Sequence, residues 1–166
     1  EVREAMEPYL REEYGNASTS YDMGVRMHDA IEEAREKIAW VIDAQPEEIF
    51  FTSGGSESDN WVIKSVAGEK KNSGKHLITT RIEHHAVLRS CQYLESLGYE
   101  VTYLDVDDYG LVSAKEVVHA LREDTTLVSV MTGNNEIGTI EPIADIGAQL
   151  RARGIAFHTD AVQAGG

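Results

Sequence analysis

The chain has 166 residues, of which 42% are hydrophobic and 27% are charged, a composition typical of a soluble globular domain and unlike that of a disordered or fibrous protein. Its 15 Lys and Arg residues against 29 Asp and Glu residues give a formal net charge of -14, which repels phosphate backbones and anionic membranes and so argues against direct nucleic-acid binding. No apolar run approaches the ~20 residues of a membrane span, and the single cysteine, Cys91, allows no internal disulfide, so the cytoplasm is the expected compartment.

The first 44 residues predict two helices. The first covers residues 1–13, and the turn-forming residues 15–20 end it. The second covers residues 22–44, where apolar side chains recur at steps of three and four residues, which predicts a helix whose apolar face lies in the core. These side chains are Met27, Ile31, Ala34, Ile38 and Val41.

The rest of the chain alternates strand patterns with helix patterns. Helices are predicted to begin near residues 56, 84, 113 and 143, and strands are predicted at 48–52, 76–80, 100–104, 126–131 and 155–159. This alternation predicts βαβ crossover units, and therefore an α/β fold with a mostly parallel sheet and flanking helices. We expect one domain over 1–166, with an N-terminal helix and loop in 1–21 and the α/β part in 22–166.

Polar segments follow four of the five predicted strands. They cover residues 53–60, 83–85, 134–136 and 160–163. Because ligands of a parallel sheet bind beyond the carboxyl ends of its strands, these segments predict a ligand site. In the first, Ser53-Gly54-Gly55-Ser56 joins a strand to a helix, so its backbone N–H groups and the helix dipole suit a phosphate. A glycine turn with a serine N-cap is the plain alternative.

Histidines and an aspartate follow later strands. His84 and His85 open a helix, where one imidazole could stack on a flat ring or move a proton, although either could equally cap the helix. Asp160 ends an apolar strand, where a carboxylate is costly unless it has a partner. The protonated ring nitrogen of pyridoxal 5'-phosphate (PLP) would be such a partner, and a helix N-cap is the alternative. A metal site formed by these three residues with Glu83 and His158 matches no standard spacing.

Taken in order, the polar segments resemble the cysteine desulfurases, which belong to the class V PLP-dependent aminotransferases. The resemblance rests on residues 51–60, Glu83-His84, residues 134–138 and residues 158–163, and it includes the early loop at residues 15–19. It covers essentially the whole chain but less than half of a complete family member. It implies an incomplete large domain of PLP fold type I, with the C-terminal half of the protein absent.

The resemblance also implies which residues contact the cofactor. Gly55 and Ser56 would hold the phosphate, and His84 would stack on the ring and move protons. Asp160 would pair with the ring nitrogen, and Gln163 and Asn135 would bond the ring hydroxyl. No metal is implied.

Several family features are expected beyond this chain. They are the Schiff-base lysine, the cysteine that accepts sulfur, the arginine that holds the substrate carboxylate, and the small C-terminal domain. Cys91 is not expected to replace the missing cysteine, because it shares an apolar helical stripe with Val87, Leu94 and Leu97, and burial makes a thiol unreactive. The chain by itself is therefore expected to be inactive.

For the whole protein, the resemblance implies the conversion of L-cysteine to L-alanine and an enzyme-bound persulfide. The family's members are homodimers that pass sulfur to iron–sulfur scaffold proteins and to thiolation proteins. A selenocysteine lyase, or another class V PLP lyase or transaminase, is the alternative within enzymes. A non-catalytic binding fragment is the alternative outside them.

Overall fold

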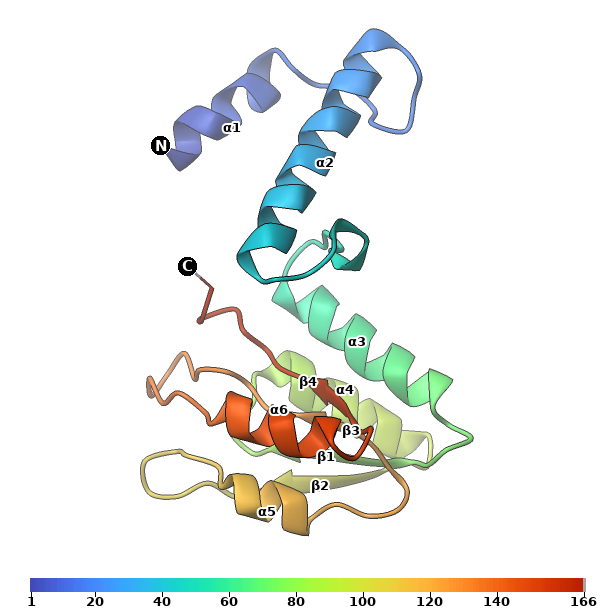
Figure 1. Ribbon diagram of the computed structural model, residues 1–166, viewed down its shortest axis with the longest axis vertical. Coiled ribbons are helices and arrows are strands. Elements are labelled where there is room, and N and C mark those ends of the chain that lie inside the picture. Colours follow the sequence, from blue (N-terminus) through green and yellow to red (C-terminus); the bar gives the residue numbers. More distant parts are fainter. Residues whose placement is uncertain (166) are drawn as a thin grey trace. The chain divides into compact units, whose positions relative to one another are not determined.

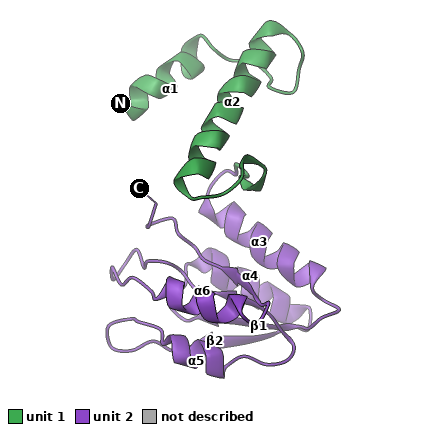
Figure 2. Ribbon diagram, viewed as in Figure 1, with its two compact units in different colours: residues 1–51 green, residues 52–166 purple. Residues whose placement is uncertain are grey.

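A computed structural model of the chain describes residues 1–165, which fall into two compact units, residues 1–51 and the part from residue 52 onward (Figure 2). Each unit has its own helices, and the second contains the sheet. Among the helices of residues 1–165, none combines the length and the apolar character needed to cross a membrane.

The first unit contains helices α1 (Val2–Arg11) and α2 (Asp22–Val41) and the short 3-10 helix η1 (Pro46–Glu48). Both predicted helices are confirmed, but the prediction that the apolar face of α2 lies in the core is wrong. Ile31 and Ile38 are 40% and 41% exposed, and Val41 is 72% exposed. A helical period shows that side chains share a face; it does not show that another part of the chain covers that face.

The predicted strand at 48–52 is absent from the sheet. Pro46, with its fixed backbone φ, starts η1, and the Glu48 carboxylate accepts the Gln45 N–H at 2.8 Å, so these residues turn instead of extending along a neighbour. Of the apolar residues that follow, Ile49 is buried, whereas Phe50 and Phe51 are exposed. The strand prediction is therefore wrong: the apolar run at 49–51 does not join the sheet.

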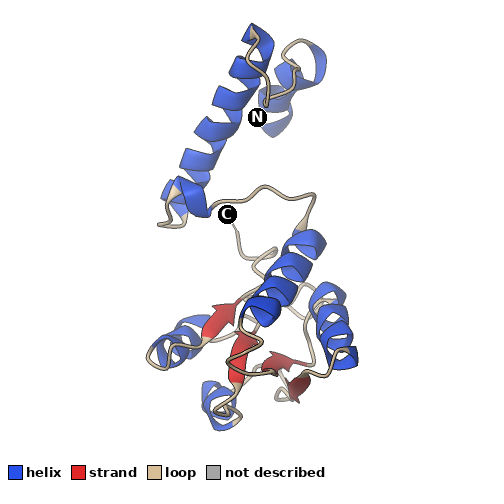
Figure 3. Cartoon of the chain, turned by 90° about the vertical axis from the view of Figure 1, so that its right-hand side faces the viewer, coloured by secondary structure: helices blue, strands red, loops and turns tan. Residues whose placement is uncertain are grey.

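The second unit is an α/β fold, as predicted. Its four strands are all parallel, in the order β2-β1-β3-β4. Figure 3 shows the strands in red, with helices packed around them. The strands are β1 (His76–Thr80), β2 (Glu100–Leu104), β3 (Thr125–Ser129) and β4 (Ala156–His158). The helices between and before them are α3 (Gly55–Glu69), α4 (His85–Ser96), α5 (Ala114–His119) and α6 (Ile143–Arg151) (Figure 1).

Helices cover both faces of this sheet. Leu77 and Leu127 pack in one buried cluster with side chains of α3 and α4, and the next residue of each strand, Ile78 and Val128, packs in a second cluster with side chains of α5 and α6. Successive side chains of a strand point to opposite faces, so apolar runs in β1 and β3 supply both cores. The sheet is thereby held as a rigid layer between two pairs of helices.

The order of the strands creates one switch point. From β1 the chain moves outward to β2, and it then returns to the other side of β1 to form β3 and β4. Connections therefore leave β1 and β3 in opposite directions, which opens a crevice beyond their carboxyl ends. Three of the predicted polar segments follow β1, β3 and β4, so the sheet directs them to this crevice.

Cys91 lies in the core that α3 and α4 form on the sheet, between the buried side chains of Val87 and Leu94. The expected burial is confirmed for these three residues. The prediction that Leu97 shares their buried stripe is wrong, because Leu97 follows the last turn of α4 and is 53% exposed. Burial raises the pKa of the Cys91 thiol to about 12, with smaller contributions from Glu83 and Glu95.

We expect Cys91 to be inert in the folded protein, because the thiolate is the reactive form and is scarce at pH 8. In the 166-residue chain, whose single cysteine is Cys91, a disulfide reagent such as dithiobisnitrobenzoate should label the thiol only after unfolding. Cys91→Ala should lower the free energy of unfolding by about 1 kcal/mol, since it removes one small buried group. Rapid stoichiometric labelling of the folded 166-residue chain would contradict this placement.

Candidate functional site

A cavity of about 240 Å³ lies at the carboxyl ends of the strands. Ligand pockets for drug-sized molecules span roughly 300–1,000 Å³, so this cavity suits a small ligand. All six residues named as site residues from the sequence line it, together with four that were given no role. The lining residues are Gly55, Ser56, Asp59, His84, Met131, Gly133, Asn135, Asp160, Val162 and Gln163.

The N-terminus of α3 forms one end of the cavity. The Gly54 carbonyl accepts the N–H groups of Glu57 and Ser58, whereas the N–H groups of Gly55 and Ser56 have no partner among residues 1–165. Free N–H groups and the positive end of the helix dipole suit an anion there. A Cβ atom on Gly55 would lie 2.7 Å from Cγ2 of Val162, so glycine lets the segment after β4 approach the helix.

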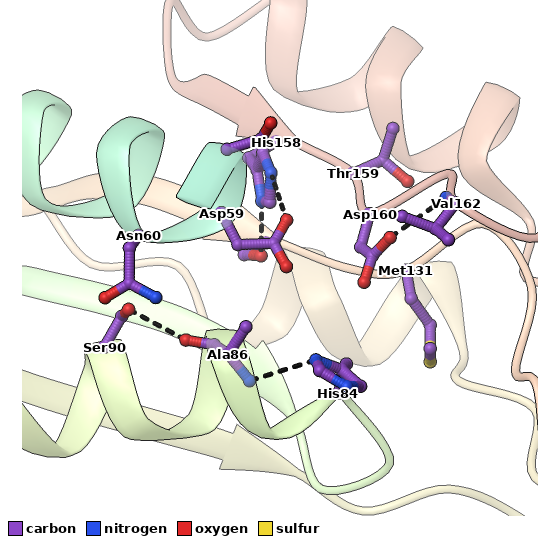
Figure 4. Close-up of polar contacts among 12 residues, drawn as sticks. Asp59, Asn60, His84, Ala86, Ser90, Met131, His158, Thr159, Asp160 and Val162 are labelled. Atoms are coloured by element: carbon purple, nitrogen blue, oxygen red, sulfur yellow. Dashed lines mark hydrogen bonds and ion pairs between the residues drawn. The ribbon is translucent and has the colours of Figure 1, made fainter. Parts of the chain in front are cut away.

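His84 both caps α4 and lines the cavity. Its Nδ1 accepts the Ala86 N–H at 3.1 Å (Figure 4), so in the neutral ring the hydrogen is assigned to Nε2. The functional and the capping interpretations of this histidine are therefore compatible. His85 begins α4 itself and is not part of the cavity lining.

Asp160 forms the buried side of the cavity, with an exposed fraction of 9%. Its Oδ1 accepts the Val162 N–H at 3.0 Å, and its backbone carbonyl accepts the Thr132 N–H at 2.8 Å, which fixes the segment after β4 against the segment after β3. Its Oδ2 has no hydrogen-bond partner in the described chain. A buried carboxylate with one free oxygen favours a cationic or N–H-bearing ligand.

The segment after β3 supplies the rim. The Nδ2 of Asn134 donates to the Ile82 carbonyl at 2.9 Å, and its Oδ1 accepts the N–H groups of Glu136 and Ile137, so Asn134 holds the loop in place. Asn135 is exposed at the rim of the cavity, and so is Gln163 from the segment after β4. Two amides are thus available to a ligand at the open side.

Asp59 is a lining residue to which the sequence assigned no role. It lies on α3 and is 3% exposed; its Oδ1 is 3.5 Å from Nε2 of His158, and its Oδ2 is buried without a hydrogen-bond partner among residues 1–165. One signal could have identified it: Gly55 and Asp59 are four residues apart, which places them on the same face of a helix.

The acidic and histidine residues that cluster in the cavity differ from the metal-site set suggested by the sequence. Ligand atoms of Asp59, His84 and Asp160 lie within 4.8 Å of one another, so these three could surround an ion, whereas Glu83, His85 and His158 are not in this group. Because His84 Nδ1 is occupied by the Ala86 N–H, a metal would have to replace the hydrogen on Nε2. The arrangement therefore suits a cationic N–H group better than a metal.

Glu83 lies behind the cavity and joins two strand ends. Its Oε1 accepts the Thr80 hydroxyl at 2.8 Å and the Met131 N–H at 2.9 Å, while its Oε2 is buried without a partner among the described residues. Burial raises the pKa of Glu83 to about 7, and the carboxylates of Asp160 and Asp59 also raise it, against the lowering effect of the two hydrogen bonds. Glu83 thereby fixes the segment that carries His84.

Comparison with known proteins identifies relatives along the whole chain. The family model for the aminotransferase class-V family matches residues 1–166. A cysteine desulfurase IscS of Methanosarcina thermophila is 55% identical over 164 residues, which is 99% of this chain and 41% of that protein. A cysteine desulfurase IscS of Dictyoglomus turgidum is 54% identical over 163 residues, again 41% of its length. The chain thus spans about two-fifths of these relatives.

Solved structures share the fold. A structure described as SspA in complex with cysteine superposes with a TM-score of 0.93 at 44% identity, covering 98% of this chain and 47% of that one. A NifS-like protein gives the same TM-score at 43% identity, with 98% and 45% coverage. The four-stranded parallel sheet and its helices are therefore part of a larger shared architecture.

Proposed function

We propose that this chain, which belongs to the aminotransferase class-V family, is the cofactor-binding part of a PLP-dependent cysteine desulfurase. The observation that carries the proposal is the cavity, which gathers an anion-binding helix end, an imidazole and a buried carboxylate from three separate segments. The names of the relatives support the same activity. The substrate would be L-cysteine, and the products L-alanine and an enzyme-bound persulfide.

The residues of the cavity fit PLP at both ends of the molecule. The free N–H groups at the start of α3 and the Ser56 hydroxyl would hold the phosphate. Asp160 would hold the ring nitrogen in its protonated form, and Nε2 of His84 would hold or release a proton beside the ring. When bound, PLP supplies a ring that withdraws electrons from the α-carbon of the substrate. Asn135 and Gln163 at the rim would orient the ring hydroxyl.

The wider setting of the chain is also part of the proposal. Residues 1–21 would be the N-terminal helix and loop, and residues 22–166 the α/β part of an incomplete large domain. The whole protein would be a homodimer that passes sulfur to iron–sulfur scaffold or other acceptor proteins. A single cysteine, which lies in the core, fits the reducing cytoplasm.

The test compares the full-length protein with the 166-residue chain. With PLP, the full-length protein should convert L-cysteine to L-alanine at a higher kcat/KM than it shows with L-selenocysteine, and form a persulfide. The chain alone should bind PLP reversibly and form no alanine, because no lysine of residues 1–165 lines the cavity. A stoichiometric borohydride-stable PLP adduct on the chain would contradict this. Preference for selenocysteine, or no alanine from the full-length protein, would refute the assignment.

A further inference from the structure

The Asp59 carboxylate has a free oxygen that nothing in the proposed mechanism uses. Asp59 is almost fully buried, yet its Oδ2 has no hydrogen-bond partner in the described part of the chain. A buried acceptor without a partner is costly, and a buried unpaired negative charge more so. Because Asp59 lines the cavity, a ligand bound there could supply a positive charge beside its carboxylate.

Two side chains hold Asp59 in this position. The Nε2 of His158 lies 3.5 Å from Oδ1 of Asp59, and the Nδ1 of His158 lies 2.9 Å from the Ser129 hydroxyl. With Ser129 donating to Nδ1, the neutral imidazole carries its hydrogen on Nε2, the nitrogen that lies near Asp59. The last residues of β3 and β4 thus place a ring nitrogen beside one carboxylate oxygen of Asp59, while the other oxygen is buried without a hydrogen-bond partner among residues 1–165.

The Asp59 carboxylate lies near the group expected to bind the cofactor nitrogen. Figure 4 shows the Asp59 carboxylate with His158 on one side and the Asp160 carboxylate on another. The ligand atoms of Asp59, Asp160 and His84 are all within 4.8 Å of one another. A cationic N–H group that contacts Asp160 therefore has a second carboxylate nearby, and both carboxylates belong to buried residues.

We propose that Asp59 is a second anionic contact for the protonated ring nitrogen of the cofactor, with His158 and Ser129 as its positioning residues. This inference rests on the proposed function, since it takes PLP as the ligand and Asp160 as its first contact. Two carboxylates around one pyridinium favour its charged form more than a single carboxylate does. Asp59 would thereby contribute to the affinity for the protonated ring and not to that for the phosphate.

The test uses the full-length protein without cofactor and two ligands, PLP and its deaza analogue, in which a C–H group replaces the ring nitrogen. Both ligands carry the same aldehyde and phosphate, so the ratio of their dissociation constants reports on the ring nitrogen alone. Asp59→Asn should weaken PLP binding by roughly tenfold and leave the binding of the analogue nearly unchanged, because only PLP offers a charge to Asp59. His158→Gln should change the ratio in the same direction by less.

The controls separate this inference from the proposed function. Asp108→Asn, an exposed substitution outside the cavity, should leave the ratio unchanged. If Asp59→Asn weakens the binding of both ligands equally, or of neither, Asp59 has only a structural role. His158→Gln gives the decision if Asp59→Asn does not fold, since an unchanged ratio overturns the inference. If the unaltered protein does not bind PLP, both proposals are overturned. If Asp160→Asn removes the preference for PLP over the deaza analogue and Asp59→Asn does not, only this inference is overturned.

Discussion

Asp160→Asn in the full-length protein should lower kcat for cysteine turnover by roughly 100-fold or more while the protein still folds and binds PLP. The amide is nearly isosteric with the carboxylate and can still accept the Val162 N–H, which in the native protein is 3.0 Å from Oδ1. It carries no charge, so it cannot keep the ring nitrogen protonated as a carboxylate does. A loss of about 3 kcal/mol of transition-state stabilisation corresponds to roughly a 100-fold fall in rate.

Steady-state kinetics with L-cysteine measures this loss, and circular dichroism checks the fold. Asp108→Asn is the matched control, because it makes the same chemical change at an exposed position away from the cavity. Full activity in a folded Asp160→Asn protein would remove Asp160 from its proposed role. It would also weaken the assignment of PLP as the ligand, since no other carboxylate in the lining has the same backbone anchor.

Glu83→Gln should remove a pH dependence of stability that the native protein has between about pH 4.5 and 7. The pKa of Glu83 is raised from 4.5 to about 7 in the folded state, so in this range the folded protein keeps a proton that the unfolded chain loses. The stabilising contribution of Glu83 is therefore complete below pH 4.5 and is lost as the pH rises through 7. The difference of about 2.5 pKa units corresponds to about 3 kcal/mol.

Urea unfolding of both proteins at several pH values between 5 and 8 measures this effect as the difference between their free energies of unfolding. Glutamine resembles the protonated carboxyl group and has no acidic proton to lose. The free energy of unfolding of the variant should therefore rise relative to that of the native protein as the pH rises. His76 acts in the opposite direction, because burial lowers its pKa, but it is common to both proteins and cancels. Glu123→Gln, at an exposed position, is the control. A constant difference across the range would show that Glu83 is ionised in the folded protein.

The sequence by itself determined the fold class and the place of the site. Apolar runs bounded by turns identified four of the strands, because a strand buried on both faces needs apolar side chains throughout. The polar segments that follow these strands identified the cavity, since the carboxyl ends of parallel strands meet at one edge of a sheet. Asp160 was recognisable because a carboxylate at the end of an apolar strand requires a partner.

The tertiary structure decided the features that depend on residues far apart along the chain. The order β2-β1-β3-β4 brings the ends of β1, β3 and β4 together, and no local pattern encodes that order. Asp59 and His158 form a pair only because α3 packs against β3 and β4 on one face of the sheet. The apolar face of α2 illustrates the same limit: periodicity aligns Ile31 with Ile38, but burial depends on what else packs there. Local sequence fixes which side chains share a face, and long-range packing fixes what each face meets.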